Sequence, residues 1–287
     1  MSSLPTPLVS TDWLAEHLDD ADLRLLDATI FLAPPAEPGA DWTQERGDAA
    51  HAEEHIPGAR YADIVSELSS ADGWFTRPDA DAFKAAVERL GVGDGTKVVV
   101  YDRAASMWAA RVWWLLRSFG FEDVAVLDGG LHRWKAEGRP TTAEPTPAAP
   151  AASFTAVDHA ELVADTDEVL AVVNDGGACL INSLTAEDFT ATETNRYARP
   201  GRIPGSLNVP VFDLLDADGR FRSPDELREH FADVLARPGR KITYCGGGIA
   251  ATADALALYL LGETDVAVYD GSLREWTADE RLPLEVG

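Results

Sequence analysis

One cysteine in the sequence stands in a setting that suits nucleophilic chemistry. Cys245 follows a short apolar run, and Gly246–Ala250 (Gly-Gly-Gly-Ile-Ala) separates it from a stretch with few charges. Three consecutive glycines allow a tight loop whose backbone N–H groups turn toward one point, and a helix behind the loop adds the positive end of its dipole. Both effects stabilise a thiolate, the reactive form of cysteine. The sequence therefore predicts that Cys245 is a nucleophile rather than a buried thiol before a flexible turn.

The other cysteine and the histidines do not indicate a second reactive site. Cys179 lies within the apolar run 178–181, which favours a small buried thiol over a redox centre. The six histidines show no spacing typical of a metal site, and the two cysteines are far apart. We therefore expect neither a metal nor a cofactor.

The chain repeats itself, and Cys245 lies in the second copy. Ile56-Pro57-Gly58 recurs as Ile203-Pro204-Gly205, and Asp128-Gly129 with Trp134 recurs as Asp270-Gly271 with Trp276, at a nearly constant offset. Ordered matches of this kind indicate two copies of one domain. The position of Cys245 corresponds to Asp102 in the first copy.

Short apolar runs alternate with helical segments in each copy, which predicts the elements that position Cys245. We expect strands at 23–26, 98–101 and 124–127, and at 178–181, 242–244 and 266–269. Helices are expected at 79–90, 106–119, 225–235 and 248–261. This alternation predicts an α/β fold with two parallel sheets, each covered by helices on both faces. A Pro-rich stretch predicts a first domain at 1–142, a linker at 143–152 and a second domain at 153–287.

Composition limits the partners. Hydrophobic residues make up 46% of the chain, which is enough for a core, and 49 acidic against 24 basic residues give a net charge of −25. A polyanion of this kind repels nucleic acid and anionic membranes, so we expect neither as a partner. The first ten residues lack the features of a signal peptide, and no apolar run is long enough to span a bilayer. These features favour a cytoplasmic protein.

The motifs resemble those of the tandem-domain rhodanese family, which are thiosulfate or 3-mercaptopyruvate sulfurtransferases. The resemblance rests on the two copies, the Ile-Pro-Gly motif in each, the Asp-Gly endings with their Trp, and the six-residue loop Cys245–Ala250. It implies two rhodanese-like domains, of which the first is inactive because Asp102 cannot form a persulfide.

The resemblance also implies a persulfide mechanism. The Cys245 thiolate would take a sulfane sulfur from thiosulfate or 3-mercaptopyruvate and pass it to cyanide, a small thiol, thioredoxin or a sulfur-relay protein. The loop that would hold the persulfide consists of Gly246, Gly247, Gly248, Ile249 and Ala250. Its lack of charge resembles the mercaptopyruvate type, although Gly247 and Ala250 replace the Ser and Thr that are usual there.

Family members commonly carry Asp-x-Arg after the first strand of the active domain, and that Arg binds the donor's anionic group. This chain has Asn182-Ser183-Leu184 instead. We expect the missing cation to come from Arg196, Arg199 or Arg202. Arg202 leads because it replaces the usual His of the His-Ile-Pro-Gly motif.

Two alternatives stay open beside the enzyme. One is a sulfur-carrier or protein-binding module in which turnover is incidental. The other is a Cys-dependent phosphatase or arsenate reductase, whose loop is one residue longer and ends in an Arg. Residues 249–252 are Ile, Ala, Ala and Thr, so a tetrahedral oxyanion would lack its bidentate partner.

Overall fold

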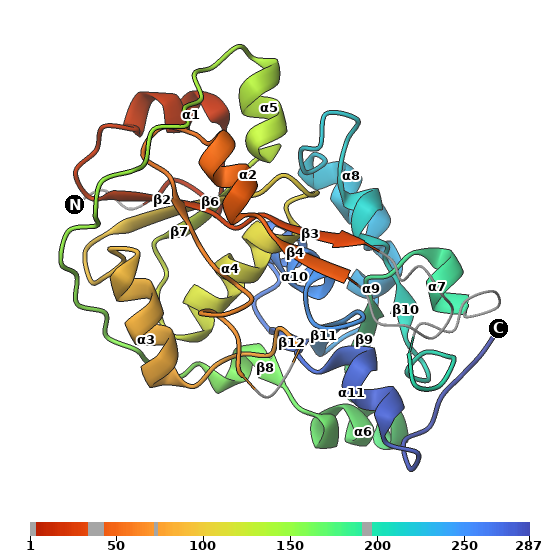
Figure 1. Cartoon of the computed structure of the whole chain (residues 1–287). Helices are drawn as coiled ribbons and strands as arrows, with labels where there is room; N and C mark the ends of the chain where they lie inside the picture. The colour runs from red at the N-terminus through yellow and green to blue at the C-terminus, as the bar shows by residue number, and fades with distance from the viewer. Residues whose placement is uncertain (1–3, 34–42, 72–73, 191–196) are drawn as a thin grey trace. The chain divides into compact units, whose positions relative to one another are not determined.

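The computed structural model describes residues 4–33, 43–71, 74–190 and 197–287. Within these ranges the chain divides into two compact units, whose elements are labelled in Figure 1. The first unit runs over residues 4–31, 44–159 and 217–220, and the second comprises the rest. Each unit is described here by itself.

The first unit is built on a five-stranded parallel sheet in the order β1-β7-β6-β2-β5. Its strands are β1 (Leu8–Val9), β2 (Leu23–Asp27), β5 (Arg60–Tyr61), β6 (Lys97–Tyr101) and β7 (Val124–Leu127). Its helices are α1 (Thr11–His17), α2 (Asp48–Glu53), α3 (Ala80–Arg89), α4 (Met107–Ser118) and α5 (Gly130–Ala136). Strands β3 (Ile30–Ala33) and β4 (Thr43–Arg46) form a separate two-stranded sheet.

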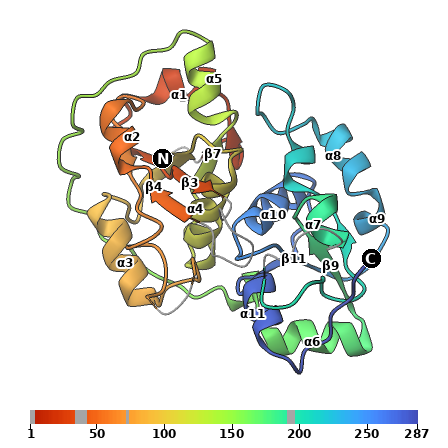
Figure 2. The same ribbon diagram turned by 45° about the vertical axis from the view of Figure 1, so that its right-hand side comes forward.

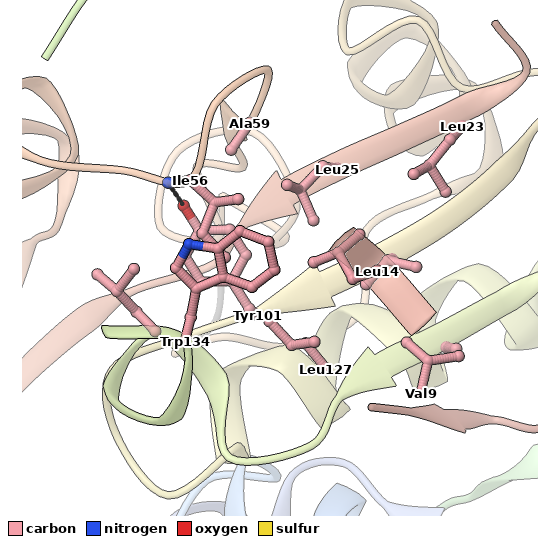
Figure 3. Close-up of a cluster of buried hydrophobic side chains, with 12 residues drawn as sticks. Val9, Leu14, Leu23, Leu25, Ile56, Ala59, Tyr101, Leu127 and Trp134 are labelled. Atoms are coloured by element: carbon pink, nitrogen blue, oxygen red, sulfur yellow. Dashed lines mark hydrogen bonds between the residues drawn. The ribbon is translucent and has the colours of Figure 1, made fainter. Parts of the chain in front are cut away.

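Apolar side chains cover both faces of this sheet, as expected of parallel strands. One face packs under α1 and α5, where Leu14 and Trp134 are fully buried against Leu25 and Leu127 (Figure 3). In the same cluster the Ile56 backbone N–H donates to the Tyr101 hydroxyl at 3.3 Å. Helix α4 packs against β6 and β7.

The second unit repeats this topology with the order β8-β12-β11-β9-β10, again all parallel. Its strands are β8 (Val163–Ala164), β9 (Ala178–Asn182), β10 (Leu207–Asn208), β11 (Arg240–Tyr244) and β12 (Val266–Tyr269). Its helices are α6 (Thr166–Asp175), α7 (Ala186–Thr190), α8 (Pro224–His230), α9 (Ala232–Leu235), α10 (Ala250–Leu260) and α11 (Ser272–Ala278), with 3₁₀ turns η1 (Ala160–Leu162) and η2 (Val211–Leu214). Figure 2 shows α6 and α11 on the opposite side of β9 and β11 from α10.

Helix α10 is buried along residues 250–258, so it is apolar all round rather than amphipathic. It packs against β11 and β12 and is held by the Thr243 hydroxyl, which donates to the carbonyl of Ala251 at 2.9 Å. None of the helices among the described residues is long and apolar enough to cross a membrane.

The two units share specific hydrogen bonds at matching positions. Ile203 N–H donates to the Tyr244 hydroxyl at 3.2 Å, as Ile56 does to Tyr101. The indole N–H groups of both repeated tryptophans donate to proline carbonyls at 2.8 Å, from Trp134 to Pro140 and from Trp276 to Pro283. These shared contacts allow positions of one unit to be matched to positions of the other.

Two features differ from the predicted elements. The helix expected at 225–235 is two helices, α8 and α9, because Phe231 leaves the helical conformation between them. Residues 153–159 belong to the first unit. Phe154 is buried there against Phe83 and Phe121, and Val157 N–H donates to the Phe119 carbonyl.

Candidate active site

Cys245 is the first residue after β11, which lies between β9 and β12 in the sheet. Ligands of open α/β sheets bind beyond the carboxyl ends of the strands, so this is where a reactive group would meet a substrate. The Cys245 side chain is 3% exposed. Helix α10 begins five residues later, at Ala250, and no side chain caps its N-terminus. The expected order of strand, cysteine, glycine loop and helix is therefore present.

The Cys245 loop (Cys245–Ala250) depends on glycine at two positions. Gly248 has φ of 76°, in the left-handed region where a side chain is strained. A Cβ on Gly246 would collide with the hydroxyl oxygen of Tyr197 and lie 3.2 Å from its Cζ. Tyr197 thus bounds the loop on one side, and no larger residue fits at position 246 without displacing it.

Ser272 braces the loop from the first turn of α11. Its Oγ accepts hydrogen bonds from the backbone N–H groups of Cys245 and Gly248, both at 3.1 Å, and donates to the Tyr269 carbonyl at 2.8 Å. Ser272 is fully buried and has φ of 51°. A non-glycine residue held in this conformation costs free energy, and such strain concentrates at functional sites. We did not predict Ser272 from the sequence; the signal was its replacement of Gly130 in the repeated Asp-Gly motif.

Two further backbone contacts join α11 to the loop. Leu273 N–H donates to the Cys245 carbonyl at 3.1 Å, and Arg274 N–H donates to the Gly246 carbonyl at 2.9 Å. The loop carbonyls are therefore directed toward α11.

Asp102 occupies the matching place in the first unit and shows what such a loop can hold. Its Oδ1 accepts from the backbone N–H groups of Ala104 at 2.8 Å and Ser106 at 3.1 Å, and its Oδ2 accepts from that of Ala109 at 2.9 Å. Burial raises the pKa of Asp102, and the amide hydrogen bonds oppose that rise. The loop of the first unit is thus filled by its own carboxyl group.

Arg202, which we expected to lead the donor-binding segment, has close partners within the second unit. Its guanidinium donates to Glu285 Oε1 at 2.5 Å and to the Gly287 carbonyl at 2.8 Å, and lies 4.4 Å from the centre of the Phe189 ring. These contacts tie Arg202 to the C-terminal segment of its own unit, and its part in donor binding stays a prediction.

Arg199 is engaged in the same way. Its guanidinium donates to the backbone carbonyls of Trp276, Thr277, Asp279 and Leu282, at the end of α11 and beyond. Cations at a helix C-terminus are stabilising, which explains the position. Arg196, the third candidate, lies outside the described residues.

The strand end that lacks the expected Arg carries polar groups turned inward. Asn182 Oδ1 accepts from Leu184 N–H at 2.9 Å, and the buried Ser183 hydroxyl donates to Asp254 of α10 at 2.8 Å. Burial raises the pKa of Asp254 well above its usual value, and the hydrogen bond from Ser183 opposes that rise. Asp254 is a buried titratable group that no sequence pattern had indicated.

Cys179 lies in β9 and is fully buried, as predicted. Burial raises the pKa of its thiol, which makes it a poor nucleophile. No group of three or more His, Cys, Asp or Glu side chains among the described residues is placed to hold a metal ion.

Comparisons with known proteins agree with this architecture. Residues 10–137 and 166–279 match a family model described as a rhodanese-like domain. The chain is 36% identical over 282 residues to the thiosulfate sulfurtransferase of Gallus gallus, covering 96% of this chain and 94% of that protein. It is 34% identical over 292 residues to the 3-mercaptopyruvate sulfurtransferase of Escherichia coli strain K12, covering 98% of each. The crystal structure of SseA, a 3-mercaptopyruvate sulfotransferase from Escherichia coli, matches with a TM-score of 0.79 at 33% identity, covering 93% of this chain and 98% of that one.

Proposed function

The chain belongs to the rhodanese family and is a sulfurtransferase of the thiosulfate or 3-mercaptopyruvate type, and from this premise we propose that Cys245 is the residue that carries the sulfur. The observation that supports this assignment is the Cys245 loop itself. Its cysteine follows the central strand β11, its glycines admit a tight turn, and α10 begins directly behind it.

The first unit supports the proposal through an internal comparison. In a cysteine persulfide the terminal sulfur is three bonds from Cα, and in aspartate each carboxyl oxygen is also three bonds from Cα. Asp102 is therefore close in reach to a persulfide at the same place, and three backbone N–H groups hold it. Ala104 and Ser106 match Gly247 and Ile249 of the Cys245 loop, so by this comparison the backbone N–H groups of Gly247 and Ile249 hold the terminal sulfur of a Cys245 persulfide.

The loading step then follows ordinary sulfur chemistry. The Cys245 thiolate attacks the outer sulfur of the donor and forms an S–S bond. With thiosulfate, the donor's S–S bond breaks and sulfite leaves with the electron pair. With 3-mercaptopyruvate, the C–S bond breaks, and the electron pair forms the enolate of pyruvate, which takes up the proton of the donor's thiol. In both cases Cys245 ends as a persulfide.

The unloading step returns the cysteine to its first state. A nucleophilic acceptor, either cyanide or a thiolate, attacks the terminal sulfur and forms a bond to it. The persulfide bond breaks, and its electron pair restores the Cys245 thiolate. We propose that a protein thiol such as that of thioredoxin or a sulfur-relay protein serves as well as a small one, in a reducing compartment such as the cytoplasm, where both cysteines stay free.

The proposed assignment is tested by intact-mass measurement after incubation with either donor and removal of excess. The wild type should gain one sulfur atom, and Cys179→Ser, the control, should gain the same. Cys245→Ser should gain none. If Cys245→Ser gains the sulfur atom, or if Cys179→Ser does not gain it, Cys245 is not the residue that carries the sulfur.

Turnover separates the enzyme from a sulfur-carrier module. An enzyme releases many equivalents of sulfite or pyruvate per Cys245 when acceptor is present, whereas a carrier stops near one equivalent until a partner protein is added. A phosphatase or arsenate reductase is disfavoured, because residues 246–252 contain no cation to bind a tetrahedral oxyanion.

A further inference from the structure

We propose that Thr243 positions the cysteine that carries the sulfur, because its hydroxyl holds the first turn of α10 against the end of β11. The inference rests on the proposed function, since it concerns the same cysteine. Thr243 is fully buried, so it acts through the helix and not by contact with a substrate. It is therefore a positioning residue.

The hydroxyl of Thr243 joins the strand that carries Cys245 to its neighbours. Thr243 precedes Cys245 by two residues, in β11. Its Oγ1 donates to the carbonyl of Ala251, in the first turn of α10, at 2.9 Å, with a longer contact of 3.4 Å to the Ala267 carbonyl of β12. Because water does not reach this buried hydroxyl, nothing competes for the bond. The place of the first turn of α10 is thus fixed relative to the strand of the nucleophile.

A second buried hydroxyl fixes the end of the Cys245 loop to the same helix. The Oγ1 and the backbone N–H of Thr252 both donate to the Ile249 carbonyl, at 2.7 and 3.0 Å. Ile249 is the loop residue directly before α10, and no side chain caps the N–H groups of that helix. The Thr243 and Thr252 hydroxyls therefore hold the helix start from both sides, one from the strand and one from the helix itself.

The first unit reaches the same arrangement without these hydroxyls. Thr243 matches Val100 in that unit. Thr252 matches Ala109. There the strand and the helix are joined by Asp102, whose Oδ2 accepts from the Ala109 backbone N–H at 2.9 Å. A thiol is a much weaker hydrogen-bonding group than a carboxylate, so a cysteine cannot replace that link. In the second unit the link is made by hydroxyls beside the reactive position.

The link matters for chemistry because the effect of a helix dipole falls off within the first turn. A thiolate and a persulfide are both anions, and both are stabilised only while the start of α10 and the loop N–H groups stay beside the sulfur. Without the Thr243 hydroxyl this turn loses its bond to β11. We therefore expect slower reaction of Cys245 with unchanged donor binding.

The experiment compares Thr243→Val, Thr243→Ser and Thr252→Ala with Thr277→Val. The last is a matched control, since the buried Thr277 hydroxyl donates to the Leu273 carbonyl within α11. Single-turnover sulfur loading is measured with thiosulfate and with 3-mercaptopyruvate, after urea denaturation has shown each variant to be folded. Thr243→Val and Thr252→Ala should lower the maximal loading rate about threefold to tenfold, with the donor concentration at half-maximal rate changed less than twofold. Thr243→Ser, which keeps the hydroxyl, and Thr277→Val should stay within twofold of the wild type.

Alkylation keeps this inference separate from the proposed function. The rate at which iodoacetamide modifies Cys245 at neutral pH, measured in the Cys179→Ser background, requires no sulfur transfer. Thr243→Val should slow it about threefold to tenfold, and Thr243→Ser should not. Unchanged loading and alkylation in Thr243→Val and Thr252→Ala would overturn the inference, and so would an equal effect of Thr277→Val or a failure of Thr243→Ser to retain the rate. If Cys245 gains no sulfur although its alkylation depends on Thr243, the proposed function fails and the positioning role stands.

Discussion

At the scale of the residue, Ser272 connects backbone strain to the proposed nucleophile. The matching Gly130 has φ of 54°, and a Cβ there would collide with the Asp102 carbonyl oxygen. The second unit accepts a serine in the same conformation, at φ of 51°, and gains a hydroxyl that binds the N–H groups of Cys245 and Gly248. The hydroxyl thus binds two backbone amides of the loop at once, which holds the loop in one conformation.

Two substitutions of Ser272 should separate the effect of its hydroxyl on activity from the effect of its backbone strain on stability. We expect Ser272→Ala to lower kcat/KM about tenfold and to destabilise the protein by about 1–3 kcal/mol, because buried N–H groups lose their acceptor. Ser272→Gly should lose as much activity but regain about 1 kcal/mol, since glycine tolerates positive φ. Steady-state kinetics and urea denaturation measure the two effects. Wild-type kcat/KM in Ser272→Gly would mean that the hydroxyl does not organise the loop.

At the scale of the element, α10 carries an acid into the core of the second unit. Asp254 is fully buried, and Ser183 at the end of β9 donates to its Oδ2. Its Oδ1 has no hydrogen-bond partner among the described residues. Burial favours the neutral form and raises the pKa well above 3.8. The ionisation of Asp254 therefore makes the packing of α10, the helix that begins behind the Cys245 loop, depend on pH.

The sign of the pH effect follows from linkage. Because the folded-state pKa of Asp254 is raised, its stabilising contribution is complete below the unfolded value, about pH 4, and is lost as pH rises toward the folded value. Asp254→Asn cannot ionise, so the stability of the wild type relative to this variant should fall as pH rises above about 4. Urea denaturation at several pH values tests this difference. A constant difference across the range would contradict it.

Elements formed by local sequence were predictable, whereas contacts between distant elements were not. Strands β7 and β12 have the predicted bounds, because runs of buried β-branched residues end at turn residues. The order of strand, Cys245, glycine loop and helix was predictable for the same local reason. Arg202 could not be placed from sequence, since its partners Glu285 and Gly287 lie more than eighty residues away. Ser272 escaped notice because α11 meets the loop only in the folded unit.

At the scale of the whole molecule, the net charge of −25 opposes compaction. Many basic side chains are already paired with acids, such as Arg240 with Glu168 and Lys97 with Asp22, but acidic residues outnumber basic residues two to one.

The repeated topology and both five-stranded sheets were predictable from the internal repeat, whereas the grouping of residues 153–159 with the first unit depends on the packing of Phe154.

Added salt should stabilise the protein by screening this repulsion. At about 20 mM salt the charges interact over long distances, and at about 0.5 M the screening length falls below the spacing of most surface pairs. A relief of about 1 kcal/mol raises Tm by about 2–4 °C in a chain of this size, and we expect at least that rise. Calorimetry in sodium chloride measures the effect, with sucrose as an uncharged control. A Tm that is flat or falls with sodium chloride would show that ion pairs outweigh the repulsion.

The unequal distribution of the tryptophans determines what fluorescence can report. The chain has eight, and within residues 166–279 Trp276 is the only one. It is fully buried beside Tyr269, and its indole N–H is bound to the Pro283 carbonyl, so its emission changes when that core opens. An unfolding curve followed by indole emission therefore records mostly the first rhodanese-like domain. Unfolding of the unit that contains Cys245 can be followed through the emission of Trp276. That emission is the difference between the fluorescence of the wild type and that of Trp276→Phe.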